Sequence, residues 1–297
     1  MDPLTTVVRP KLPVSVTLSL ATLRHGPRDP TVRVRDGEVW RATRTPGGPA
    51  TVCYTQRSDE VVVRAWGPGA EHALAAAPAV LGVHDDLEGW NPSAHPVLAD
   101  LDHRLPGLRM IATGAVIEAI VPTVIEQKVT SKEAHESWRR MAWRWGEPGP
   151  GPDAVRLPPS PHRLSCEPYY AYHRFGLERK RADILRRLAD RSQRVEEAAG
   201  IGRSRLEAFP GVGAWTSAKV AQVAWGDADA VPVGDYHLPS VVVYALTGRR
   251  GGDDDAMLEL LEPFAPHRGR AARLLKLGGP RRPRRAPRAR LRDFTRW

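Results

Sequence analysis

The pattern of polar and apolar residues changes near residue 90, and this change sets the fold class. Before it, short segments alternate with a period of two, as in Thr31–Asp36 and Glu38–Thr43, which meet at an Asp-Gly pair typical of a two-residue hairpin. From His95 onward, apolar residues recur at helical spacing. We therefore expect an α+β protein with an antiparallel sheet domain over residues 1–92 and a mostly helical domain over residues 93–279.

Further elements follow from the same patterns. The remaining strand candidates are Val14–Leu20, Thr51–Thr55 and Glu60–Trp66. Thr130 and Glu133 form a capping box, which predicts that a helix begins there. The other predicted helices are Ala70–Ala77, Gly114–Val129 (with a kink at Pro122), Glu178–Asp190, Ser204–Phe209, Ala214–Trp225, His237–Leu246, Asp254–Phe264 and Arg268–Leu277.

Composition narrows the class of protein. No run of eighteen apolar residues occurs, so we expect no membrane-spanning helix. The first residues lack the basic and apolar regions of a signal peptide, which predicts a cytoplasmic, nucleoid-associated protein. Cys53 and Cys166 are the two cysteines, too few for an iron–sulfur cluster or a structural zinc site.

The charge favours a polyanionic partner, with nucleic acid first. The formal net charge is +10, and residues 280–297 carry eight arginines against one aspartate, a net +7 of that total. We expect this basic Arg/Pro tail to be solvated and to add a nonspecific attraction to DNA that weakens steeply with salt. The remainder of the chain is only mildly basic.

A glycine-rich hairpin, residues 209–216, separates two predicted helices with the sequence Phe-Pro-Gly-Val-Gly-Ala-Trp-Thr. Gly211 and Gly213 flank one apolar residue, which predicts a tight turn at the N-terminus of the next helix. Backbone amides in such a turn, together with the helix dipole, can bind a phosphate. An ordinary helix–helix turn with a glycine C-cap is the alternative.

An aspartate follows the hairpin at a defined distance. Asp235 lies twenty residues after Trp215, within Val-Pro-Val-Gly-Asp-Tyr-His, and directly precedes the apolar helical segment Val241–Leu246. A helix N-cap is the ordinary role for an aspartate in this place. A catalytic carboxylate is the second interpretation.

The hairpin followed by Gly-Asp-Tyr-His resembles the helix-hairpin-helix (HhH-GPD) DNA glycosylase superfamily, and within it the AlkA-like 3-methyladenine DNA glycosylase II group. Arg109–Ala134 resembles the helix pair that carries this family's glutamine before the DNA wedge, and Phe264–Ala271 resembles its late Trp/Phe-x-Pro-x-Arg segment. The resemblance covers roughly residues 14–277. It implies a TBP-like antiparallel sheet domain followed by the helical glycosylase domain.

The resemblance also implies a reaction. The matching aspartate, Asp235, faces the deoxyribose of a flipped nucleotide and serves hydrolysis of the N-glycosidic bond in base excision repair. Trp215 stands where bifunctional members carry a Schiff-base lysine, so a monofunctional enzyme that leaves an abasic site is implied. Trp215, Lys219 and His237 would line the base pocket. No cofactor is required, and the expected partner is double-stranded DNA containing a damaged base, bound by a monomer.

The resemblance also implies which residues bind DNA and which bind a cation. The expected DNA-binding residues are Gln127, Lys128, Gly211, Val212, Gly213, Ala214, Arg268 and Arg270. The family often binds a monovalent cation, Na⁺ or K⁺, through hairpin carbonyls, which here belong to Glu207, Phe209 and Val212.

Two lysines depart from the family pattern. Lys128 stands at the position of an apolar wedge, and Lys219 at that of a pocket tyrosine. Because a lysine repels a cationic base, the expected alkylated purine has an alternative in an uncharged lesion such as hypoxanthine or an etheno-adduct. Lyase activity through Lys219 and a noncatalytic damage-binding protein are further alternatives.

Overall fold

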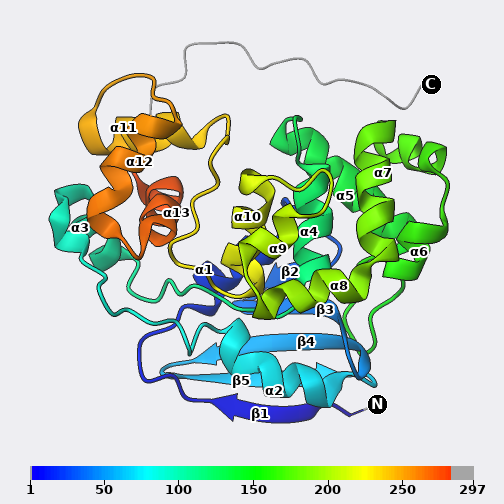
Figure 1. Ribbon diagram of the computed structural model, residues 1–297. Helices are drawn as coiled ribbons and strands as arrows, with labels where there is room; N and C mark the ends of the chain where they lie inside the picture. The colour runs from blue at the N-terminus through cyan, green and yellow to red at the C-terminus, as the bar shows by residue number, and fades with distance from the viewer. Residues whose placement is uncertain (1, 282–297) are drawn as a thin grey trace.

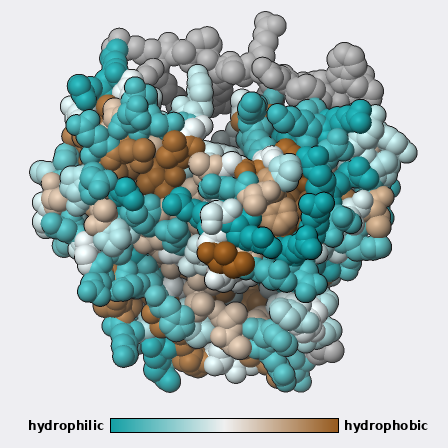
Figure 2. Space-filling view, viewed as in Figure 1, coloured by the Kyte–Doolittle hydropathy of each residue, from teal (hydrophilic) through white to brown (hydrophobic). Residues whose placement is uncertain are grey.

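The structure is a computed structural model, and it describes residues 2–281 (Figure 1). Most of the basic tail expected at residues 280–297 therefore lies outside the described residues. The face shown in Figure 2 is mostly hydrophilic, with hydrophobic residues gathered in a few separate patches. Within the described part of the chain, no helix combines the length and the apolar character needed to cross a membrane.

The N-terminal part forms the predicted antiparallel sheet. Its strands are β1 (Leu4–Val8), β2 (Val32–Arg35), β3 (Glu38–Thr45), β4 (Gly48–Arg57) and β5 (Glu60–Trp66), in the order β1-β5-β4-β3-β2. The β2–β3 hairpin has the predicted register, because Asp36 (φ +50°) and Gly37 (φ +79°) both adopt the left-handed conformation that this turn requires.

One strand prediction is wrong. Residues of the predicted strand Val14–Leu20 form helix α1 (Val16–Leu20), and the first strand is the earlier segment β1. The Ser15 side chain accepts a hydrogen bond from the Leu18 N–H and caps the helix. Val16 and Leu20, four residues apart, are thereby both buried against the sheet.

Both faces of the sheet are covered. Helices α1 and α2 (Ala70–Val80) pack on one face. On the other face, the Trp40 and Trp66 rings stack with centroids 5.2 Å apart. Val155 and Leu157, from the proline- and glycine-rich segment after the fifth helix, are buried against them. That segment is therefore part of the packed structure.

In the helical part, the described helices form two groups (Figure 1), and each group surrounds a large hydrophobic core of its own. The first group consists of α4 to α10, and the second consists of α3 together with α11 to α13. Helix α3 of the second group therefore precedes the whole first group in the sequence. The bounds of these helices are α3 (Pro96–Arg104), α4 (Val116–Ile125), α5 (Ser131–Trp145), α6 (Pro161–Cys166), α7 (Arg179–Asp190), α8 (Ser192–Glu196), α9 (Arg203–Glu207), α10 (Ala214–Ala224), α11 (Leu238–Thr247), α12 (Asp254–Leu261) and α13 (Arg268–Gly278). The capping box at Thr130 and Glu133 is present and begins α5, as predicted.

Helix α4 lies at the centre of the first group. All its residues except Glu118 are buried, and it continues past Pro122 to Ile125. Glu118 accepts hydrogen bonds from the Arg41 guanidinium (2.8 Å), the Thr43 hydroxyl and the Arg44 N–H (2.6 Å). This carboxylate joins strand β3 to the helical part.

We predict that Glu118→Ala strongly destabilises the fold, because it leaves Arg41, which is 6% exposed, without its ionic partner. Breaking one side of a buried ion pair costs about 3–5 kcal/mol. Urea denaturation measures the change in the free energy of unfolding. The control is Asp100→Ala, which removes an exposed pair with Arg104 on α3 and should cost less than about 0.5 kcal/mol. Equal losses in the two variants would contradict the role given to Glu118.

Candidate active site

A cleft of about 1460 Å³ brings together the two helical groups and the N-terminal part. It is lined by residues that follow α1, by the loop between α4 and α5, by α10, by the segment before α11 and by α13. Residues more than 200 positions apart in the chain therefore share one cavity: His25, Glu126, Lys219, Asp235 and Lys276 all line it.

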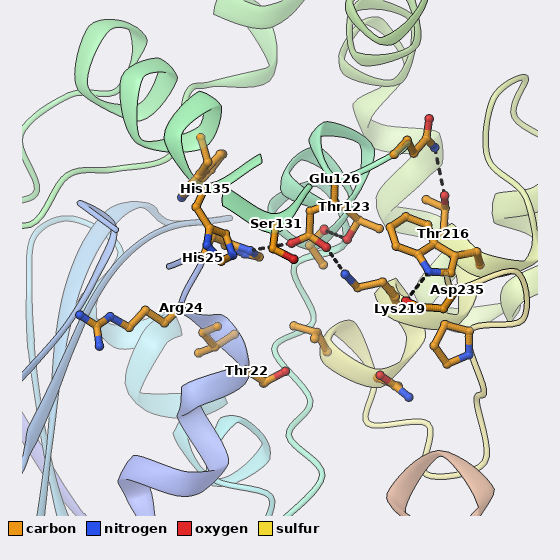
Figure 3. A pocket seen from close by; sticks show the side chains of 18 of the residues that line it. Thr22, Arg24, His25, Thr123, Glu126, Ser131, His135, Thr216, Lys219 and Asp235 are labelled. Carbon is orange, nitrogen blue, oxygen red and sulfur yellow. Dashed lines mark hydrogen bonds and ion pairs between the residues drawn. The ribbon is translucent and has the colours of Figure 1, made fainter. Parts of the chain in front are cut away.

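Asp235 lies on the wall of this cleft and binds the backbone at the start of α11, whose N-cap residue is His237. Its Oδ1 atom accepts hydrogen bonds from the N–H groups of His237 and Leu238, each 2.9 Å away. Its Oδ2 atom accepts one from the Trp215 indole Nε1 at 3.0 Å (Figure 3). One half-buried side chain thus holds the start of α11 and lines the cleft.

The pKa of the Asp235 carboxyl is lowered. Burial by itself would raise the pKa, but the hydrogen bonds from Trp215, His237 and Leu238 and the positive charge of Lys276 outweigh it. The side chain is therefore an ionised carboxylate at neutral pH, with its two oxygens fixed in direction by three donors.

The hairpin leaves backbone amides unpaired. Gly211 has φ +94°, and a Cβ there would lie 2.5 Å from the Ile184 side chain, so both the turn and the close packing require glycine. Among the hydrogen bonds of the described residues, none is donated by the backbone N–H of Gly211, Gly213 or Trp215. Gly213, whose added Cβ would meet nothing within 4 Å, faces open space. Such amides at the start of α10 are suited to an anion.

The α4–α5 loop is fixed to the hairpin. The Gln127 side-chain nitrogen donates to the Gly211 carbonyl and to the Thr216 hydroxyl, each at 3.0 Å. The next residue, Lys128, is exposed in the left-handed conformation (φ +56°) and lines the cleft. The structure thus places the predicted wedge position beside the hairpin.

The Lys219 ammonium lies over the face of the Trp215 ring. Lys219, one turn later on α10, places Nζ 4.7 Å from the ring centroid and forms an ion pair with Glu126 at the end of α4. On the far side of Glu126, its Oε1 atom lies 3.6 Å from His25 Nδ1. Figure 3 shows this row of side chains running from His25 to Lys219, with Asp235 beyond it.

Glu126 is ionised. Burial would raise its pKa, but the adjacent His25 and the Lys219 ammonium lower the pKa to about 2. The pair therefore presents a carboxylate and an ammonium side by side, with side chains 21% and 25% exposed.

Glu126 and His25 were not predicted from the sequence. A signal for Glu126 existed: it ends an apolar helix, where a carboxylate opposes the helix dipole and requires a cationic partner. His25 gives no comparable local signal, because its partner lies about a hundred residues away in sequence.

Two arginines expected to contact DNA form ion pairs within the protein. Arg270 is 3% exposed and forms a buried ion pair with Asp85, so the prediction of a surface arginine is wrong. Arg268 is bound to Asp229 through both its backbone N–H and its guanidinium. From the same helix, Arg273 and Lys276 line the cleft instead.

The predicted cation ligands have free acceptor capacity. The Phe209 carbonyl accepts the Val212 N–H at 3.0 Å, and no hydrogen bond among the described residues ends on the Glu207 or Val212 carbonyl. The described residues hold no cluster of three or more His, Cys, Asp or Glu side chains suited to a metal. A monovalent ion at the hairpin carbonyls fits these groups and stays a prediction.

Comparison with known proteins identifies the fold. No family model matches the chain. Among solved structures, the 3-methyladenine DNA glycosylase from Archaeoglobus fulgidus superposes with a TM-score of 0.75 at 20% identity, over 91% of this chain and 97% of that one. The 8-oxoguanine glycosylase/lyase of Clostridium acetobutylicum gives 0.71 at 13% identity, over 93% and 96%. The protein thus has the fold of the helix-hairpin-helix DNA glycosylases, as the sequence resemblance predicted.

Within this fold, the resemblance is to the AlkA-like group. The chain is 28% identical over 215 residues to the probable bifunctional transcriptional activator/DNA repair enzyme AlkA of Mycobacterium tuberculosis. The match covers 69% of this chain and 43% of that protein, so the chain spans less than half the length of this curated relative.

We predict that Trp215→Phe raises the pKa of the Asp235 carboxyl, because the substitution removes the indole N–H that stabilises the charged form while keeping an aromatic ring. The titration of the Asp235 carboxyl carbon, followed by NMR, measures this. Trp143→Phe, on the exposed side of α5, is the control and should leave the titration unchanged. An unaltered Asp235 titration in Trp215→Phe would refute the assigned hydrogen bond.

Proposed function

We propose that the protein is a monofunctional DNA glycosylase that hydrolyses the N-glycosidic bond of a damaged base, in the first place an alkylated purine, and leaves an abasic site for base excision repair. The observation that carries the proposal is the ionised Asp235 carboxylate, held by three donors on the wall of a cleft. The names of similar proteins, an AlkA and a 3-methyladenine DNA glycosylase, support the same class of substrate.

The chemistry follows from the charge that develops in the reaction. Breaking the bond between the base and C1′ builds positive charge on the deoxyribose. A fixed carboxylate beside the sugar stabilises that charge and orients or deprotonates the attacking water. An alkylated purine is already cationic and leaves readily, so the single carboxylate of Asp235 suffices.

Binding of duplex DNA is assigned to the hairpin and to the loop next to it. The unpaired N–H groups of Gly211, Gly213 and Trp215 would receive a backbone phosphate. A Na⁺ or K⁺ ion held by hairpin carbonyls would add positive charge there. Lys128 would enter the duplex where the base leaves it, with its methylene stem filling the space. All these groups lie on one chain, which supports action on DNA as a monomer.

Lyase activity is the less favoured alternative. A Schiff base requires a free amine, and the Lys219 Nζ atom is engaged by the Glu126 carboxylate. Trp215, at the hairpin, has no nucleophilic group. Borohydride should therefore trap no covalent complex with DNA. A noncatalytic damage-binding protein is the other alternative, but phosphate binding alone gives no reason for an ionised Asp235 in the cleft.

We predict that Asp235→Asn abolishes base release and leaves DNA binding intact, because the amide keeps the shape but not the charge. Loss of such electrostatic stabilisation lowers the rate by at least about a hundredfold. Single-turnover release of methylated bases and the Kd for duplex DNA measure the two effects. Asp100→Asn, on the exposed surface of α3, is the matched control. Excision at the unaltered rate by Asp235→Asn would remove Asp235 from the mechanism.

The two hairpin glycines provide a second prediction. Gly211→Ala should lower the Tm, because its φ is positive and its Cβ would collide with Ile184. Gly213→Ala should leave the Tm nearly unchanged, since its Cβ meets open space, yet weaken binding to an abasic-site duplex severalfold by obstructing the phosphate. Thermal melting and fluorescence anisotropy separate these effects. Undiminished affinity in Gly213→Ala would argue against phosphate binding at the hairpin.

A further inference from the structure

The side chains next to the candidate catalytic carboxylate form a pair that the hydrolysis itself does not use. Lys219 and Glu126 line the same cleft as Asp235, and Lys219 lies over the Trp215 ring, whose edge binds Asp235. A base that leaves the duplex beside Asp235 therefore enters next to one ammonium and one carboxylate. Resting on the proposed function, we infer that Lys219 and Glu126 read the edge of the flipped base and select a 6-oxopurine over a 6-aminopurine.

Both groups keep hydrogen-bonding capacity toward the cleft. Lys219 has three N–H donors, of which Glu126 takes one and the Trp215 face receives the ammonium. The Glu126 carboxylate has acceptor sites beyond those directed at Lys219 and His25. Their side chains are 25% and 21% exposed, so a ligand can reach them. The burial is still sufficient to strengthen charge-assisted hydrogen bonds.

The order of donor and acceptor gives the selectivity. A 6-oxopurine, such as hypoxanthine or 7-methylguanine, presents a carbonyl oxygen at position 6 and an N–H at position 1. Lys219 donates to the oxygen, and Glu126 accepts the N–H. An adenine-type base presents the reverse order, which sets an amino group against an ammonium and a lone pair against a carboxylate. A site rejects a base strongly when binding that base leaves buried polar groups unpaired or brings like groups together.

The same ammonium assists departure of an uncharged base. Water adds its oxygen to C1′ as the bond between C1′ and N9 breaks, and Asp235 accepts a proton from that water. The electron pair of the broken bond leaves with the base, and the negative charge spreads to O6, where Lys219 donates. The base then takes up a proton from solvent, and Asp235 returns its proton to solvent. Stabilising the leaving anion extends the reaction to lesions that carry no positive charge.

The experiment compares bases that differ at this edge. Release of 7-methylguanine and 3-methyladenine is followed from the same methylated DNA, and release of hypoxanthine and adenine from duplexes with an abasic-site analogue opposite. Each rate is divided by the spontaneous release rate of that base. We expect the rate enhancement to be at least about tenfold greater for the 6-oxo member of each pair.

Variants test the two side chains directly. Exchanging the charges in Glu126→Lys/Lys219→Glu keeps an ion pair and reverses donor and acceptor, so the preference should invert toward 6-aminopurines. Lys219→Met removes the donor and should lower hypoxanthine release at least about tenfold while affecting 3-methyladenine little. Lys132→Met, outside the cleft, is the matched control. Circular dichroism and the Kd for abasic DNA establish that each variant is folded.

The outcomes separate this inference from the proposed function. Equal enhancement within both pairs, or a preference for 3-methyladenine that Lys219→Met does not change, overturns the edge reading and leaves the glycosylase intact. Release of no base by the unaltered protein overturns the glycosylase and the inference with it. A 6-oxo preference that is lost in Lys219→Met supports the inference, even if the charge-exchanged double variant does not fold.

Discussion

The position of the candidate active site depends on helix α4, in which every residue except Glu118 is buried. Helix α4 is buried along its length and packs against α5, α7, α8 and α10. Its polar anchors are therefore concentrated at its ends. Glu196 accepts hydrogen bonds from the Val116 and Ile117 N–H groups at 2.8 and 3.0 Å, and Glu118 ties the first turn to the sheet. Beyond its last turn, Gln127 binds the hairpin. The loop at the cleft is fixed because the helix behind it cannot shift without exposing apolar surface or unpairing buried charge.

These anchors also explain why the sheet domain belongs to the site. Arg41 of β3 binds Glu118 in the first turn of α4. His25, in the segment after α1, contacts Glu126 at the last turn of the same helix. A three-part cleft results, in which the N-terminal domain contributes the His25 imidazole to the lining of the pocket and does more than support it.

The features that could be predicted from the sequence are those that local interactions determine. The Asp36-Gly37 turn, the Thr130 capping box and the helical segments each depend on neighbours a few residues away. Asp235 and the hairpin were found because their motifs are contiguous. Features that depend on distant contacts were missed or misassigned. Lys219 pairs with Glu126 across 93 positions, and Arg270 pairs with Asp85 across 185. The alternating residues of Val14–Leu20 are compatible with a strand as well as with a helix. The Ser15 cap and the burial of Leu20 stabilise the helix.

The indole of Trp215 is shared between two tasks, since its N–H edge binds Asp235 and its face lies under Lys219. Substitutions at positions 126 and 219 leave the donor to Asp235 in place, so the proposed recognition of the base can be altered without removing the hydrogen bond to the proposed catalytic carboxylate. A substitution at Trp215 disturbs both at once. The ring therefore couples the position of the Lys219 ammonium to that of the Asp235 carboxylate.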